Sequence, residues 1–159
     1  MRVAVLADTH LRGGVDGLSP LARRELDEAD VVLHAGDVVE PALLAELPEP
    51  WHAVLGNNDH SLVGTLPDRL ELELGGVRVA MVHDSGARTG RERRMRRWFP
   101  TADVVVFGHS HDPVDVEGVD GQRLFNPGSA VQRRRQPHRT MGVLVLGDGR
   151  VVDHRIVVV

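Results

Sequence analysis

Five short apolar segments, each followed by a cluster of polar side chains, limit the folds that this chain can adopt. The segments are Val3–Ala7, Val31–His34, His52–Leu55, Val77–Val82 and Val104–Phe107. Apolar runs of this length, bounded by glycine and polar residues, are typical of buried β-strands. The clusters that follow them are Asp8-Thr9-His10, Gly36-Asp37, Gly56-Asn57-Asn58-Asp59, His83-Asp84 and Gly108-His109-Ser110-His111. Because the carboxyl ends of parallel strands lie side by side, we expect these clusters to meet in one crevice.

The order of the predicted elements indicates an α/β fold. In the first half, the apolar segments alternate with predicted helices over about 20–29, with Ser19 as the N-cap, and about 41–47. Strand, helix, strand, helix, strand implies parallel βαβ units. The second half is richer in strands, with hairpin turns expected at Gly75-Gly76 and Asp148-Gly149.

Missing residue types narrow the possible chemistry. The chain has no cysteine, which excludes disulfides, thiolate zinc sites and a cysteine nucleophile. All 19 basic residues are arginine, and the absence of lysine excludes Schiff-base chemistry and a Walker-type phosphate loop. With nine histidines present, a transition-metal site would use imidazole, carboxylate and amide ligands. The length suits one domain over residues 1–159.

Charge and hydropathy bear on partners and location. The net charge of −4 and the 3% aromatic content give no support to nucleic-acid binding. No apolar run is long enough to span a membrane, and the first residues do not resemble a signal peptide. We therefore expect a cytoplasmic protein without a membrane or nucleic-acid partner.

The polar clusters together supply seven candidate metal ligands. They are Asp8, His10, Asp37, Asn57, His83, His109 and His111. This set is too large for one tetrahedral ion and suits two ions that share a bridging carboxylate. The lack of thiols favours manganese, iron, zinc, nickel or cobalt. Two ions roughly 3.5–4 Å apart form a clamp for in-line displacement at phosphorus, so the pattern predicts phosphate-ester chemistry.

The same motifs, in this order, resemble those of the calcineurin-like metallophosphoesterases. The likeness rests on Asp8-x-His10, Gly36-Asp37, Gly56-Asn57-x-Asp59, His83 after a strand, and Gly108-His109-Ser110-His111. It is strongest to the small prokaryotic phosphodiesterase branch, which Asn126-Pro127-Gly128-Ser129 also resembles, and it covers most of the chain. The resemblance implies a four-layer α/β/β/α sandwich of two mixed sheets, the metallo-dependent phosphatase fold.

The resemblance also implies a role for each ligand. One ion would be held by Asp8, His10 and His111, the second by Asn57, His83 and His109, and Asp37 would bridge them. The implied activity is hydrolysis of a phosphodiester or phosphomonoester by a hydroxide that bridges two divalent ions, with manganese favoured. Asn57 and Asn58 are candidate phosphate-binding groups.

Two positions depart from the family pattern. Phosphatase members carry, after the ligand asparagine, a histidine thought to protonate the leaving group, whereas this chain has Asn58. Small phosphodiesterase members also lack that histidine, so the departure favours them. His60 or a metal-bound water could serve as the acid instead, although for His60 we favour a surface role. Asp84 stands where the family usually has glycine and could alter the loop around His83.

Each candidate ligand also has a structural alternative. Asp8 and Asp37 could be helix N-caps, and the histidines could be ordinary loop residues, but their joint placement at strand ends argues against this. For His34, inside a strand, we favour a buried hydrogen-bonding role. The turn at 126–129 is expected to order the backbone beneath the site. The histidines expected to be surface or packing residues are His52, His138 and His154.

The arginine-rich segments raise a separate question. A capping box at Thr89 predicts a helix to about Trp98, with Met95, Trp98 and Phe99 as its buried stripe. We favour a solvated or subunit-facing arginine surface there over nucleic-acid binding. The alternative is that one or two arginines reach an anionic substrate, and the same question applies to Arg133–Arg135.

Three functions are compatible with these motifs. The leading one is a two-metal phosphoesterase that acts on a small phosphate ester. The second is a protein-interaction scaffold of the same fold, as in a retromer subunit, and the third is nucleic-acid processing. The complete ligand set argues against the scaffold, and related nucleases normally carry extra domains. A homo-oligomer remains open, with Trp98-Phe99 as the candidate contact.

Overall fold

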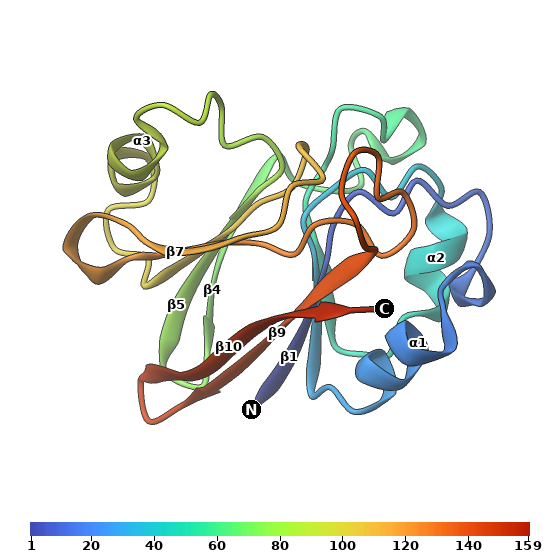
Figure 1. Ribbon diagram of the computed structural model, residues 1–159, viewed down its shortest axis with the longest axis horizontal. Helices are drawn as coiled ribbons and strands as arrows, with labels where there is room; N and C mark the ends of the chain where they lie inside the picture. Colours follow the sequence, from blue (N-terminus) through green and yellow to red (C-terminus); the bar gives the residue numbers. More distant parts are fainter.

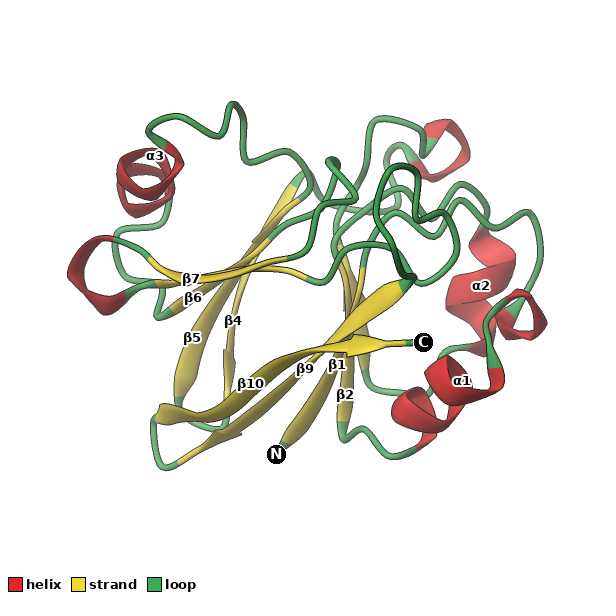
Figure 2. Ribbon diagram, viewed as in Figure 1, coloured by secondary structure: helices red, strands yellow, loops and turns green.

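The computed structural model describes all 159 residues as two five-stranded sheets that face each other between outer helices (Figures 1 and 2). The first sheet has the order β10 (Arg150–Val158), β9 (Thr140–Gly147), β1 (Arg2–Leu6), β2 (Val31–His34), β3 (Trp51–Ala53). The second has the order β4 (Arg69–Leu74), β5 (Val77–Val82), β6 (Val104–Val106), β8 (Arg123–Asn126), β7 (Val114–Glu117). The helices are α1 (Pro20–Asp27), α2 (Pro41–Glu46) and α3 (Arg91–Trp98), with short 3-10 turns at Val15–Gly17, His60–Leu62 and Val119–Gly121.

Alternation along the strands creates the layers. In β1, Val3 and Val5 join the core between the sheets, whereas Ala4 and Leu6 join a second core beneath α1 and α2. A third core packs Met95 of α3 against the other face of the second sheet. Accordingly α1 and α2 lie on one side of the molecule and α3 on the opposite side (Figure 1). This confirms the expected four-layer sandwich of two mixed sheets.

The predicted strand pairings and hairpins are confirmed. β1 pairs parallel to β2, and β2 parallel to β3, as the βαβ pattern requires. Gly75 and Gly76 turn the β4–β5 hairpin with φ of 58° and 78°, a left-handed conformation at both central residues that glycine adopts at little cost. Asp148 and Gly149 turn the β9–β10 hairpin in the same way.

The two predicted helix starts have different outcomes. Ser19 caps α1, because its Oγ accepts a hydrogen bond of 3.1 Å from the Ala22 N–H. The capping box at Thr89 is wrong, because Gly90 is the N-cap of α3 and no side chain caps the helix. The chain enters α3 with a left-handed φ of 71° at Gly90, which a β-branched threonine would adopt only with strain. The helix therefore starts one residue later than the capping box requires.

The arginine-rich helix is only partly solvated. Arg94 and Arg96 donate to the backbone carbonyls of Ser85 (2.7 Å) and Val119 (2.8 Å) and so fasten neighbouring loops. Phe99 is buried in the core of its own chain and Trp98 is half-buried, so only Trp98 of this pair is accessible at the surface. No helix has both the length and the apolar character needed to cross a membrane.

The strand ends that carry the polar clusters all open on the same side of the molecule. The loops after β1, β2 and β3 leave the first sheet, and those after β5 and β6 leave the second. They gather between the two sheets, at the top of the view in Figure 2. The expected crevice therefore lies between two sheets rather than along the edge of one.

Candidate metal centre

Backbone hydrogen bonds hold the loops of the crevice in register. The Asp8 N–H donates to the Gly36 carbonyl (2.9 Å), which joins the loop after β1 to the loop after β2. The Gly108 N–H donates to the His83 carbonyl (2.9 Å), which does the same for the loops after β6 and β5. The His109 N–H donates to Asp8 Oδ1 (3.1 Å) and so links the two sheets. The candidate ligands are therefore placed by hydrogen bonds that backbone N–H groups donate.

One group of ligand atoms comprises Asp8, His10 and His111, all within 4.8 Å of one another. The Nε2 atoms of the two histidines lie 3.2 Å apart in stacked rings. His111 and Asp8 are buried, and His10 is half-buried. This is the set that the resemblance assigns to one ion.

A second group forms around His83. Its Nε2 lies 3.0 Å from Asn57 Oδ1, and His109 Nδ1 lies 2.8 Å from the same oxygen. Asn57 and His109 are exposed, whereas His83 is buried, so this group faces solvent on one side. The structure thus brings together the three residues that the resemblance assigns to the second ion.

Asp37 lies between the two groups. Its Oδ2 is 3.4 Å from His10 Nε2 in the first group, and its Oδ1 is 3.5 Å from His83 Nε2 in the second. Asp8 also contributes an oxygen within 4.8 Å of both Asp37 and His83. All seven predicted ligands therefore meet at one place, with a carboxylate in the position that a bridging ligand needs.

The donor set fits divalent cations. Asp8 Oδ2 is buried and has no hydrogen-bond partner. The ring Nδ1 atoms of His83 and His111 lie 2.7 Å from the Ala35 carbonyl and 2.6 Å from the Gln132 carbonyl, so these nitrogens carry protons and donate. In the neutral rings, the lone pairs of both Nε2 atoms then face the centre, as in histidines that bind metal ions. Oxygen and imidazole acceptors thus converge without enough donors between them, and a cation is the partner that this arrangement suits.

The electrostatics of the centre show the same need for positive charge. Burial raises the pKa of Asp8 to about 7. Burial alone would raise the pKa of Asp37 too, but hydrogen bonds from His83 and Asn58 outweigh it and hold that pKa well below its usual range. Burial lowers the pKa of His10 and His111, which keeps both rings neutral and able to ligate. For His83, contacts with Asp37 overcome burial and raise the pKa, so a proton and a metal ion compete for its Nε2.

Several ligands occupy strained backbone conformations. The left-handed φ values are 53° at Asp8, 48° at His10, 59° at Asp37, 70° at His109 and 57° at His111. Each costs on the order of 1–2 kcal/mol for a residue with a Cβ atom, and such strain clusters at functional sites. The backbones of Gly56 and Asp37 also approach closely. A Cβ atom at position 56 would lie 2.1 Å from the Asp37 nitrogen, so only glycine fits there.

The supporting residues fall partly where the sequence predicted. His34 is fully buried and its Nε2 lies 3.0 Å from Thr9 Oγ1, which confirms its hydrogen-bonding role. In the turn at 126–129, Ser129 Oγ donates to the Asp8 carbonyl (2.7 Å) and Asn126 Nδ2 to the Gly108 carbonyl (3.1 Å), so the turn orders the backbone beneath the site as expected. Sequence reasoning assigned no role to Asp59, whose buried carboxylate accepts three backbone N–H bonds from the loops of the site. Its place in the Gly56-Asn57-x-Asp59 motif was the available signal.

The remaining predicted residues lie at the rim. Asn58 donates to Asp37 from its side-chain Nδ2 (2.7 Å) and from its backbone N–H (2.9 Å), so its amide is engaged by the carboxylate. His60 is exposed and lines a cavity of about 350 Å³ together with His10 and Asn58. Asp84 is exposed, and its Oδ1 accepts from the Gly86 N–H (2.7 Å), so it shapes its own loop.

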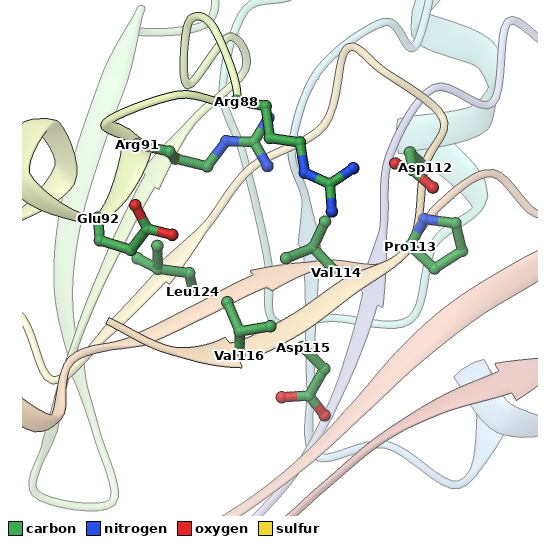
Figure 3. A pocket seen from close by; sticks show the side chains of 9 residues that line it. All are labelled: Arg88, Arg91, Glu92, Asp112, Pro113, Val114, Asp115, Val116 and Leu124. Atoms are coloured by element: carbon green, nitrogen blue, oxygen red, sulfur yellow. The ribbon is translucent and has the colours of Figure 1, made fainter. Parts of the chain in front are cut away.

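Two further features lie away from the centre. His154, expected to be a surface or packing residue, is half-buried with its Nδ1 2.7 Å from Asp115 Oδ2. A cavity of about 490 Å³ lies on the outer face of the second sheet, where Arg88 and Arg91 stand over Val114 and Val116 (Figure 3). None of the seven candidate ligands lines that cavity.

Comparisons with known proteins agree with this geometry. Residues 1–149 match the family described as the calcineurin-like phosphoesterase superfamily domain. A probable metallophosphoesterase of Methanothermobacter thermautotrophicus is 31% identical over 99% of this chain and 92% of its own length. A structure described as a novel archaeal phosphodiesterase superposes with a TM-score of 0.76 at 23% identity, over 100% of both chains. Vps29 of Entamoeba histolytica in complex with Zn²⁺ superposes with a TM-score of 0.74 at 22% identity, over 99% of both chains. This chain therefore belongs to the calcineurin-like phosphoesterase superfamily.

Proposed function

We propose that this protein is a phosphodiesterase that uses two divalent metal ions, with manganese favoured. The observation that carries the proposal is the convergence of the seven candidate ligands with their acceptor atoms facing one another. Such groups repel one another or remain unpaired unless cations lie between them. One ion would be held by Asp8, His10 and His111, the other by Asn57, His83 and His109, with Asp37 between them.

The residues of the chain would position the substrate. When bound, the two ions would supply a water molecule of lowered pKa and neutralise charge on the phosphate oxygens. Asn57 Oδ1 faces His83 and His109, so the Nδ2 group of this exposed side chain is left to donate to a phosphate oxygen. The carboxylate of Asp37, ionised and held by Asn58, would keep the two halves of the centre at a constant separation.

The residue at position 58 favours diesters over monoesters. Asn58 cannot release a proton, and its amide is engaged by Asp37. Monoesters react through a loose transition state with early charge on the leaving oxygen, so they depend more on an acid at this position than diesters do. The fold-level likeness to an archaeal protein described as a phosphodiesterase supports the same substrate class.

The test compares two esters with one leaving group. Protein stripped with a chelator and reloaded with Mn²⁺ is assayed for glycerol release from bis(glycerol) phosphate and from glycerol phosphate, whose alkoxide leaving group needs a proton, and elemental analysis gives the metal content. We expect metal-dependent turnover with the diester preferred. The variant Asp37→Asn should lower kcat/KM on the diester by about 100-fold or more. The matched control is Asp27→Asn, which removes an exposed carboxylate on α1 and should change nothing.

Each part of the proposal has its own contradicting result. If the metal-loaded protein hydrolyses neither ester, the enzymatic function is wrong and a scaffold role gains weight. If it hydrolyses the monoester faster than the diester, the protein is a metal-dependent phosphoesterase but the assignment to diesters is wrong.

A further inference from the structure

Three consecutive arginines, Arg133–Arg135, lie in a loop that is tied to the candidate metal centre at both ends. On one side, the Gln132 carbonyl accepts a hydrogen bond of 2.6 Å from the ligand His111. On the other side, Gln136 Nε2 donates to Asp112 Oδ1 (3.1 Å), and Asp112 directly follows His111 in the chain. We call these three residues the arginine segment. Both of its ends are therefore anchored to the loop that carries a candidate ligand.

The arginine segment is also closed on itself. The Gln136 N–H donates to the Arg133 carbonyl (2.8 Å), and Arg133 Nη1 donates to the Gln136 carbonyl (2.8 Å). These bonds make a turn that presents its arginines to solvent. None of the three guanidinium groups forms an ion pair with an acidic side chain. Three adjacent positive charges without an ion-pair partner repel one another, and a bound anion would relieve that repulsion.

A polar cavity of about 520 Å³ lies against the arginine segment. It is lined by Ser110, Asp112, Arg133, Arg134, Arg135 and Gln136, with no hydrophobic residue among them. Three arginines against one carboxylate give this lining a formal charge of +2. Ser110 Oγ accepts from Asn126 Nδ2 (3.2 Å) and from the Asp112 N–H (3.3 Å), so its hydroxyl hydrogen is free to donate into the cavity. A lining of arginine and hydroxyl donors without apolar surface is suited to phosphoryl oxygens.

The arginine segment also adjoins the centre through two neighbouring residues. Gln132, which directly precedes the segment, lines a cavity of about 350 Å³ together with the candidate ligand His10 and with Asn58. Ser110, which lines the cavity against the arginine segment, stands in the chain between the candidate ligands His109 and His111. The cavity at the arginine segment and the metal centre are therefore built from adjoining residues.

We propose that the arginine segment and Ser110 bind a second phosphoryl group of the substrate, so that the enzyme prefers phosphodiesters with another phosphate in the part that is not cleaved. The inference rests on the proposed function, because it takes the metal centre as the place where the scissile phosphate lies. The arginines would hold the second phosphate through paired N–H···O bonds, while the centre holds the first.

The kinetic test uses two esters that differ only in the second phosphate. Thymidine 5′-(p-nitrophenyl phosphate), with and without a 3′-phosphate, releases the same leaving group from the same diester. We expect kcat/KM to be about tenfold higher or more for the 3′-phosphorylated ester. The double variant Arg134→Gln/Arg135→Gln should bring the ratio close to one and leave kcat/KM on the other ester within about twofold. The control Arg93→Gln removes an exposed arginine of α3 and should keep the ratio.

A binding measurement separates this inference from the proposed function. Thymidine 3′,5′-bisphosphate and thymidine 5′-monophosphate are titrated calorimetrically into manganese-loaded protein, which requires no turnover. Tighter binding of the bisphosphate that disappears in the double variant supports the phosphate subsite, even if neither ester is hydrolysed and the phosphodiesterase assignment fails. Equal affinity for the two nucleotides, or a preference that the double variant retains, overturns the inference. A preference lost equally in Arg93→Gln also overturns it, because net charge alone would then explain the result.

Discussion

One buried carboxylate, that of Asp59, joins the backbones that carry two of the candidate ligands. Its Oδ2 accepts from the N–H groups of Asp37 (2.9 Å) and Gly56 (2.7 Å), and its Oδ1 accepts from the N–H of Val39 (2.6 Å). Asp59 is 1% exposed and has no arginine partner, so these three N–H groups solvate its charge. The substitution Asp59→Asn keeps the shape and removes that charge.

The cost of Asp59→Asn follows from the three bonds. The amide oxygen can keep the pair from Asp37 and Gly56, but each bond weakens by about 1 kcal/mol when its acceptor becomes neutral. The amide NH₂ then faces the N–H of Val39, donor against donor, which costs about 1–3 kcal/mol. Relief of repulsion with the nearby Asp37 carboxylate offsets part of this, so we expect a loss of about 3 kcal/mol in the free energy of unfolding. Because the loops of Asp37 and Asn57 would separate, metal affinity should fall by about 10–100-fold.

The measurement is urea unfolding in the presence of a chelator, together with calorimetric titration of Mn²⁺ into the folded variant. Asp27→Asn, on the exposed surface of α1, is the matched control and should shift the unfolding free energy by less than about 0.5 kcal/mol. If Asp59→Asn matches the wild type in both unfolding and Mn²⁺ affinity, the proposed coupling between Asp59 and the site loops is wrong.

Three further predictions concern other residues around the centre. Burial lowers the pKa of His34 to about 3, so the folded state stays neutral while the unfolded chain takes up a proton below about pH 6.5. The free energy of unfolding should therefore fall as the pH is lowered from 8, by about 2 kcal/mol at pH 5. In urea unfolding with a chelator present, His34→Gln should remove this part of the dependence of the unfolding free energy on pH. If the variant keeps the same pH dependence, His34 is not its source. Ser129→Ala deletes the hydrogen bond to the Asp8 carbonyl, so we expect the free energy of unfolding to fall by about 1–3 kcal/mol. We also expect weaker Mn²⁺ binding by calorimetry. An unchanged Mn²⁺ affinity would limit Ser129 to a structural role. If His60 supplies the leaving-group proton, His60→Ala should slow hydrolysis of an alkyl diester about tenfold or more. Hydrolysis of p-nitrophenyl esters should not change, because their leaving group departs without protonation. Equal effects on both kinds of ester would mean that His60 is only a surface residue.

Much of the fold could be read from local pattern. Short apolar runs, the Ser19 cap and the two hairpin turns act over a few residues, and all of them appear where the sequence placed them. The Thr89 capping box failed because the geometry of the preceding loop, closed by left-handed Gly90, decided where α3 begins. Local signals thus predict the existence of an element better than its first residue.

The candidate ligands could also be named from sequence, because Asp8, His10, Asp37, Asn57, His83, His109 and His111 each follow a strand at a recognisable spacing. Their assembly is a tertiary property. The strands that carry them belong to two different sheets, and hydrogen bonds such as that from the His109 N–H to Asp8 Oδ1 join residues more than 100 positions apart in the sequence.

The residue types alone define the chemical groups that this protein can use: oxygen and imidazole ligands, with neither thiol nor lysine. Packing sets which atoms face inward, which rings donate to a carbonyl, and how Asp59 holds two ligand loops with a single carboxylate. Side-chain identity is a local property, whereas burial and hydrogen-bond geometry arise only when segments distant in the chain pack together.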